Sequence, residues 1–151
     1  PLTLGITAGY LNAKYQNFAL TGQAASIAGL QAFDYSGQRM IFSPSLQVAL
    51  TANLDLPLDD RLRLVGNWLT SHVSDIVMSK SAVLPDPVQP GYWLTNVRIG
   101  VRTADDRYGL YLYVNNLFNK YYTTFGSTGV LGSSFVEGDP RIIGGEIQIK
   151  F

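Results

Sequence analysis

The sequence predicts an antiparallel all-β fold and, within that class, a segment of a transmembrane β-barrel. Three observations support this prediction. Apolar and polar residues alternate over about six segments of strand length. One of these segments is longer than the strands of most soluble proteins. Short and long connections follow each other in strict alternation along the chain.

The clearest segment is residues 42–56 (FSPSLQVALTANLDL), which keeps its alternation over about 14 residues. A tilted strand needs about 9–11 residues to cross a bilayer, so this segment is long enough to span one. Successive side chains of a strand point to opposite faces. One face carries Phe42, Leu46, Val48, Leu50, Ala52, Leu54 and Leu56, and the other carries Ser43, Ser45, Gln47, Thr51, Asn53 and Asp55.

The remaining five segments alternate in the same way. Their apolar residues are Leu2, Leu4, Ile6, Ala8 and Tyr10; Leu62, Leu64 and Trp68; Trp93, Val97, Ile99 and Val101; Leu110, Leu112 and Val114; and Ile143, Ile147, Ile149 and Phe151. We expect the apolar face, which includes Leu46, Val48, Leu50, Leu54, Ile147 and Ile149, to contact lipid. The opposite face, with its polar residues, suits a hydrated or filled barrel interior. Val48 is expected near the middle of the membrane.

The connections between these segments are of two kinds. Residues 57–60 (PLDD) and 104–107 (ADDR) are predicted to form tight polar turns. Residues 16–40, 79–91 and 123–139 are long and irregular, and the glycine-containing stretch 126–139 is expected to be a flexible loop. Outer-membrane barrels have short periplasmic turns and long extracellular loops, which is the same arrangement.

Aromatic residues are concentrated where the predicted strands meet the long loops. They are Tyr10, Phe42, Trp68, Trp93, Tyr121 and Tyr122. Amphipathic rings at such positions are typical of an interfacial girdle at the level of the lipid headgroups. Ordinary packing at loop edges would also explain them, and the sequence leaves both interpretations open.

The composition excludes several classes of protein. The 151 residues suffice for one domain, 1–151, and the formal net charge of zero gives no basic surface for nucleic acid. The absence of cysteine removes disulfides, thiolate metal sites and cysteine nucleophiles. No run of about 18 apolar residues predicts a transmembrane helix, but barrel strands carry a much weaker hydropathy signal.

The sequence gives little support for an enzyme, a cofactor or a metal site. His72 has Ser71, Ser74 and Asp75 nearby, but residues this close on an extended strand point to alternating faces and cannot form a triad. A polar histidine at the edge of a loop is the better interpretation. Four aspartates, Asp59, Asp60, Asp105 and Asp106, are expected to be turn residues.

The C-terminal third carries two motifs in a fixed order. Val114, Asn116, Leu117, Phe118, Asn119 and Tyr122 match the pattern V-x-N-L-F-[DN]-x-x-Y, with asparagine at 119 where aspartate is commoner, and Gly138, Pro140, Arg141 and Gly144 match G-x-P-R-x-x-G. The chain then ends on an alternating stretch with Phe151 last. In these features it resembles the C-terminal end of the barrel of a TonB-dependent outer-membrane receptor.

This resemblance implies a large barrel of about 22 strands that is filled by an N-terminal plug. Because about six strands are predicted and no plug, we expect the chain to supply the final strands, with the rest on missing residues or another chain. The partners implied are outer-membrane lipid, the remaining barrel and plug, the TonB complex through an absent N-terminal segment, and a transported nutrient. Family members take up ferric siderophores, haem, cobalamin or oligosaccharides, and the sequence does not indicate which.

The resemblance also assigns roles to particular residues. Ile147, Ile149 and Phe151 resemble the terminal signal that the barrel-assembly machinery reads in this family. Tyr111, Tyr113 and Asn115 are expected to face the lumen, where they could contact a plug or a solute. Asn116 would then point at lipid if alternation continued, so either the phase changes there, for example at a bulge, or Asn116 lies above the hydrocarbon.

Two other protein classes remain open. One is a complete eight-stranded outer-membrane barrel with a structural or adhesion role, which would need two further strands within residues 16–40. The other is a soluble all-β binding module, and solubility of the isolated chain without detergent would favour it.

Overall fold

The computed structural model describes residues 1–20, 32–81, 84–129 and 132–151, and the fold is all-β with antiparallel sheets. The main sheet has six strands: β1 (Leu2–Tyr10), β4 (Leu46–Pro57), β5 (Leu62–Val73), β8 (Tyr92–Thr103), β9 (Tyr108–Asn115) and β12 (Ile142–Ile149). These correspond to the six predicted segments. No helix long and apolar enough to cross a membrane is present among the described residues.

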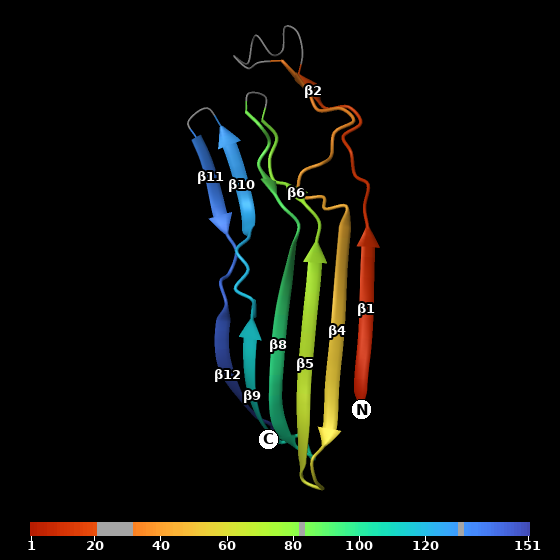
Figure 1. The fold of residues 1–151 in the computed structure, drawn as a ribbon, viewed down its shortest axis with the longest axis vertical. Helices are drawn as coiled ribbons and strands as arrows, with labels where there is room; N and C mark the ends of the chain where they lie inside the picture. Colours follow the sequence, from red (N-terminus) through yellow and green to blue (C-terminus); the bar gives the residue numbers. More distant parts are fainter. Residues whose placement is uncertain (21–31, 82–83, 130–131) are drawn as a thin grey trace.

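The six strands form a simple meander. Their order across the sheet is β1-β4-β5-β8-β9-β12, so each strand pairs with the next main strand along the chain. The turns 58–61 and 104–107 are short and lie at one end of the sheet, and the three long connections lie at the other (Figure 1). The predicted alternation of short and long connections is therefore confirmed.

The long connections are more regular than the sequence indicated. Each contains a small two-stranded sheet: β2 (Ala19–Leu20) with β3 (Phe33–Asp34), β6 (Ile76–Val77) with β7 (Val88–Gln89), and β10 (Thr123–Gly129) with β11 (Gly132–Glu137). The interpretation of 126–139 as a flexible loop is wrong over the described residues, because most of them belong to the β10–β11 hairpin. Val130 and Leu131, which lie between β10 and β11 in the sequence, are outside the described residues.

Three predicted strands are too long. The first, which the sequence pattern predicts over residues 2–15, ends at Tyr10, and the last, predicted to run to Phe151, ends at Ile149. The second begins at Leu46, because Phe42 has a φ of 51° and cannot continue an extended strand. Val48 therefore lies near the loop end of β4 and not at its middle.

The strand register collects the predicted apolar residues on one face. One row crosses all six strands as Leu4, Ala52, Trp68, Val97, Val114 and Ile143, and the next row toward the short turns on this face is also largely apolar. The neighbouring row on the opposite face reads Thr3, Asn53, Asn67, Arg98, Tyr113 and Gly144. We call these the apolar face and the polar face.

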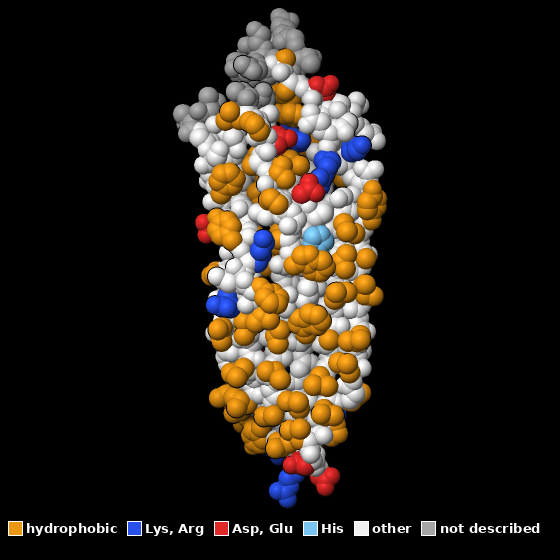
Figure 2. Space-filling view, in the orientation of Figure 1, with side chains coloured by type: hydrophobic (Ala, Val, Ile, Leu, Met, Phe, Trp, Pro, Cys, Tyr) orange, Lys and Arg blue, Asp and Glu red, His pale blue; other side chains and the backbone are white. Residues whose placement is uncertain are grey.

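The apolar face is uncovered by any described part of the chain. The exposed fraction is 71% for Leu4, 62% for Leu112 and 75% for Ile147. By contrast, Tyr111, which points to the polar face beside Leu112, is only 4% exposed. Figure 2 shows hydrophobic side chains spread over the sheet, with charged side chains mainly at the lower tip and in the upper part.

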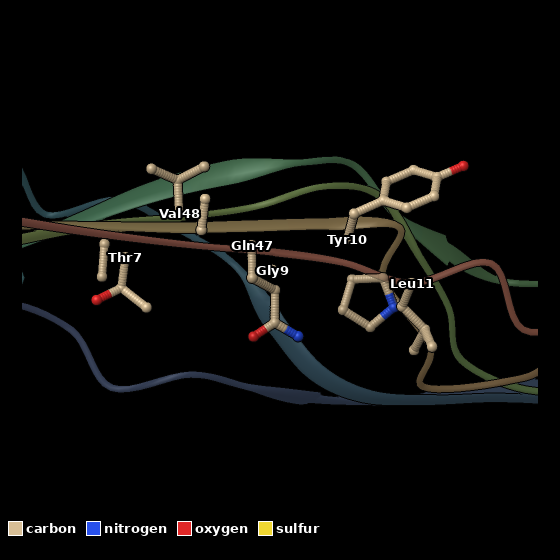
Figure 3. A pocket seen from close by; sticks show the side chains of 9 residues that line it. Thr7, Gly9, Tyr10, Leu11, Gln47 and Val48 are labelled. Carbon is tan, nitrogen blue, oxygen red and sulfur yellow. The ribbon is translucent and has the colours of Figure 1, made fainter.

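The two outer strands leave the sheet open. Among the residues that the structure describes, β1 pairs only with β4, and β12 pairs only with β9. Figure 3 shows Thr7 and Gln47 pointing to one side of the β1–β4 pair, and Val48 and Tyr10 pointing to the other. The hollow of about 350 Å³ at this place is therefore the open edge of the sheet and not an enclosed site.

The eight-stranded barrel needs two further strands from residues 16–40. β2 and β3 do lie there, but they pair only with each other and not with the main sheet. Within the described residues, the main sheet therefore has six strands. Residues 21–31, which belong to the same segment, lie outside the described part.

An ion pair and a side-chain hydrogen bond join the first and second long connections, and a further ion pair lies within the second. Arg39 donates to Asp75 across 2.5 Å, and Lys80 donates to Asp86 at 2.7 Å and to Gln38 at 2.9 Å. The buried side chains of this region include Tyr35, Val77 and Met78. The connections thus form a small packed layer of their own above the sheet.

Candidate functional site

Charged residues on the polar face form a continuous ladder near the short turns. Asp55 accepts hydrogen bonds from Arg63 (2.7 Å) and Arg102 (2.9 Å), and Arg102 also bonds Asp106 at 2.8 Å. Lys150 donates to the other oxygen of Asp106. The ladder links β4, β5 and β8 with the second turn and the end of the chain.

Asp106 is held as a carboxylate by this ladder. The hydrogen bond from Lys150, followed by that from Arg102, lowers the pKa of Asp106 from its ordinary value. Asp106 also has a φ of 59°, which a two-sided ion pair helps to hold in place. Asp59 instead accepts the backbone N–H groups of Arg61 and Leu62, both at 2.7 Å. Both aspartates are therefore turn residues, as predicted.

A second cluster lies on the polar face above the ladder. The Arg98 guanidinium stacks on the ring of Tyr111, 3.6 Å from its centroid, and donates to Glu146 at 2.9 Å. The hydroxyl of Tyr111 donates to Gln148 at 3.2 Å. Stacking on an aromatic face while pairing with a carboxylate is a geometry that suits arginine better than lysine. We take this cluster as the candidate binding site.

Tyr111 and Tyr113 point to the polar face, as the sequence predicted. The ring of Tyr113 covers Gly144, where an added Cβ would overlap the ring. The ring of Tyr111 lies over Gly109 in the same way. Glycine at these positions lets the rings pack closely against the sheet instead of projecting from it.

We expect Gly144→Ala to destabilise the sheet by about 1–3 kcal/mol, because the methyl group forces the Tyr113 ring out of its position. Gly145→Ala is the matched control, since an added Cβ there would lie 3.7 Å from its nearest neighbours, an ordinary contact distance. Denaturant unfolding of both variants measures the difference. Equal unfolding midpoints would contradict the conclusion that close packing of the Tyr113 ring on Gly144 stabilises the sheet.

Asn115 and Asn116 have different roles. Asn115 is the last residue of β9 and is exposed, and the structure gives its side chain no contact that supports a binding role. Asn116 has a φ of 50° and is only 5% exposed. The strand therefore ends at this point without a bulge, and Asn116 turns inward into the connection that follows.

The side chain of Asn116 holds two separate parts of the chain together. Its Nδ2 donates to the carbonyls of Lys120 (2.9 Å) and Asp139 (3.0 Å), and its Oδ1 accepts the N–H of Lys120 at 2.7 Å. Its own N–H donates to the side chain of Asn96 at 2.9 Å. We call this arrangement the asparagine knot.

Other motif residues extend the asparagine knot. Asn119, also with a φ of 50°, accepts the N–H of Arg141 at 3.0 Å. The N–H of Gly138 donates to the carbonyl of Tyr122 at 2.8 Å, and an added Cβ at Gly138 would overlap the Tyr122 ring. The structure thus brings the two sequence motifs together, although a gap of more than a dozen residues separates them. Their contacts here are structural.

The remaining motif residues lie outside this knot. Val114 sits on the apolar face between Val97 and Ile143, and Phe118 is 76% exposed. Ile147 and Ile149 lie on the apolar face of β12, and Phe151 follows the end of that strand, fully exposed. The described residues place nothing over these side chains.

The cluster around His72 has no triad geometry. His72 Nδ1 lies 3.1 Å from the carbonyl of Tyr92, and its ring stacks on Trp93 with centroids 4.6 Å apart. Asp75 is paired with Arg39 instead. His72 is the penultimate residue of β5, directly before the second long connection, so the predicted position at the edge of a loop is confirmed.

One predicted member of the aromatic girdle is misplaced. Trp68 lies in the middle row of the sheet, opposite Ala52 and Val97, far from the long connections. Tyr10 and Trp93 do lie where strands meet these connections, and Tyr122 stacks on Tyr92 at 4.8 Å. Among the described residues, no group of three or more histidine, cysteine or acidic side chains could hold a metal ion.

No family model matches the sequence, and no solved structure matches the chain.

Proposed function

We propose that this chain is the C-terminal part of the barrel of a TonB-dependent outer-membrane transporter. The observation that carries the proposal is the uncovered apolar face. Its central row is apolar across all six strands, and Leu4, Leu112 and Ile147 on it are each more than half exposed. An apolar surface of this extent is expected to contact lipid or another protein.

The connections and the polar face support the same proposal. Short turns at one end and long, structured connections at the other are typical of outer-membrane barrels. The polar face would line the interior of the barrel, where its ion pairs and tyrosines are satisfied away from lipid. The open edges of β1 and β12 would pair with the remaining strands, because unpaired backbone groups are costly in hydrocarbon.

In this proposal the short turns are periplasmic and the long connections are extracellular. The remaining strands, a plug and a segment that contacts TonB would lie outside this chain. The substrate would be a scarce nutrient such as a ferric siderophore, haem, cobalamin or an oligosaccharide. No catalytic step is part of this function.

The proposal is tested by locating the full-length protein that contains this chain. We expect it in the outer-membrane fraction, with faster migration in unheated than in heated detergent samples, because folded barrels resist unfolding by cold detergent. Recovery in the soluble fraction without detergent would favour the soluble binding module instead.

Phe151 gives a second test. We expect Phe151→Ser to reduce delivery of the full-length protein to the outer membrane, since the terminal aromatic resembles a signal for barrel assembly. The folded protein should lose at most about 1–3 kcal/mol, because the ring is fully exposed in the chain itself and would bury only part of its surface at the membrane interface. Fractionation measures delivery, and heat-modifiable migration of refolded protein measures folding. Normal delivery would leave Phe151 as an ordinary interfacial aromatic.

A further inference from the structure

The polar face contains a pit of about 80 Å³ beside Arg98. It is lined by Val65, Gly66, Asn67, Arg98 and Tyr111. In the strand register, Gly100 lies between Val65 and Tyr111 and contributes no side chain to the pit. An added Cβ at Gly100 would overlap Tyr111, so this glycine lets the Tyr111 side chain lie close against β8, where it forms one side of the pit next to the Arg98 guanidinium.

Arg98 is oriented by its neighbours but is incompletely hydrogen-bonded. The Tyr111 ring supports one face of the guanidinium, and Glu146 accepts a hydrogen bond from Nη2 at 2.9 Å. Arginine has five N–H donors, yet Nε is buried and has no acceptor within the described structure. The side chain as a whole is 39% exposed, so it can still be reached from the polar side. Because Nε itself is buried, an acceptor in the pit would bond the exposed part of the guanidinium.

We propose that this pit binds a single carboxylate group through the Arg98 guanidinium. A planar carboxylate matches the fork of arginine donors and can take two of them at once. The pit can hold a group of that size but not a large ligand. The carboxylate can come from a small dissolved acid or from an acidic side chain of the same protein that lies against the polar face.

The negative charge of Glu146 determines which anion can bind in the pit. Its carboxylate already bonds the same guanidinium, so the pair together is close to neutral. A carboxylate adds one negative charge next to Glu146, whereas a phosphate dianion adds two and is repelled more strongly. Removing the charge of Glu146 should therefore strengthen binding of a carboxylate. A purely structural Arg98–Glu146 pair predicts no such gain.

The test uses the full-length protein and phenylglyoxal, which modifies accessible guanidinium groups. Peptide mass spectrometry measures the rate at Arg98, with Arg61 in the first turn as the internal control. Acetate is added against chloride at matched ionic strength. If the pit takes a dissolved carboxylate, acetate slows modification at Arg98 several-fold and leaves Arg61 unchanged. In Glu146→Gln, less acetate should suffice for the same protection.

The same measurement identifies the second source. If an acidic side chain of the protein occupies the pit, Arg98 reacts slowly with phenylglyoxal before any acetate is added. High salt then increases the rate at Arg98, in Glu146→Gln as well as in the wild type. The proposal is overturned if the rate at Arg98 responds neither to acetate nor to salt in the Glu146→Gln background. The outcome does not depend on where the protein is located, so it is independent of the transporter proposal.

Discussion

Arginine in place of Ala52 is expected to destabilise the protein folded in a bilayer by about 2–4 kcal/mol. Ala52 lies in the central row of the apolar face, between Leu4 and Trp68. If this face contacts lipid, the charged group must be placed near the middle of the hydrocarbon. Arginine at Thr51, the preceding residue, points to the polar face and should cost much less.

Val48→Arg and Ala52→Arg together test how the cost of a charged residue depends on its depth in the membrane. Val48 lies only two residues from the start of β4, so it is closer to the interface than Ala52. Its cost should fall between that of Ala52→Arg and that of the polar-face variant Gln47→Arg, because the penalty declines toward the headgroups. Folding of the full-length variants into bilayers, followed by urea titration, measures all four. Equal costs at Ala52 and Thr51 would contradict the assignment of the apolar face to lipid.

The faces of the sheet could be predicted because they follow from a period of two. Once a residue such as Ala52 is assigned to a strand, its neighbours on both faces follow from geometry alone. The two short turns, with their aspartates, then pair β4 with β5 and β8 with β9. For this reason, the pairing of Ala52 with Trp68 is already implicit in the sequence pattern.

The ends of the strands could not be predicted in this way. Phe42 fits the apolar pattern, but its positive φ places it outside β4, and a bulky aromatic carries no sequence signal for that conformation. The hairpins β2–β3 and β6–β7 were missed because two-residue strands have no measurable alternation, and β10–β11 was missed because its strands consist mainly of glycine, serine and threonine. Trp68 was misplaced because an aromatic at mid-strand looks the same in sequence as one at a strand end.

The candidate site was only partly predictable. Tyr111 and Tyr113 were assigned to the correct face by alternation, but the contact between Arg98 and Tyr111 depends on a diagonal approach between strands. The asparagine knot joins Asn116 to Asp139 across a long connection. The signal that could have indicated the turn is asparagine itself, which tolerates a left-handed backbone better than most residues.

Asn116→Ala is expected to cost about 3–5 kcal/mol of stability, from two effects that add. The side chain makes three hydrogen bonds to backbone groups of Lys120 and Asp139, and removing it leaves those groups without partners. Alanine also adopts the left-handed backbone of this position less readily than asparagine, at about 1 kcal/mol. Asn116→Gly separates the two effects, because it restores the backbone freedom but not the hydrogen bonds.

Asn115→Ala is the matched control for this prediction, since Asn115 is the exposed neighbour at the end of β9 and should change stability by less than about 0.5 kcal/mol. Urea unfolding of the full-length variants gives the three values. Asn116→Gly should lie between Asn116→Ala and the wild type if both effects operate. If Asn116→Ala were no worse than Asn115→Ala, the knot would not stabilise the chain, and the two sequence motifs would need another explanation for their proximity. A large loss at Asn116 alone would instead mean that these motif residues close the connection before the last strand, which positions β12 to pair with β9.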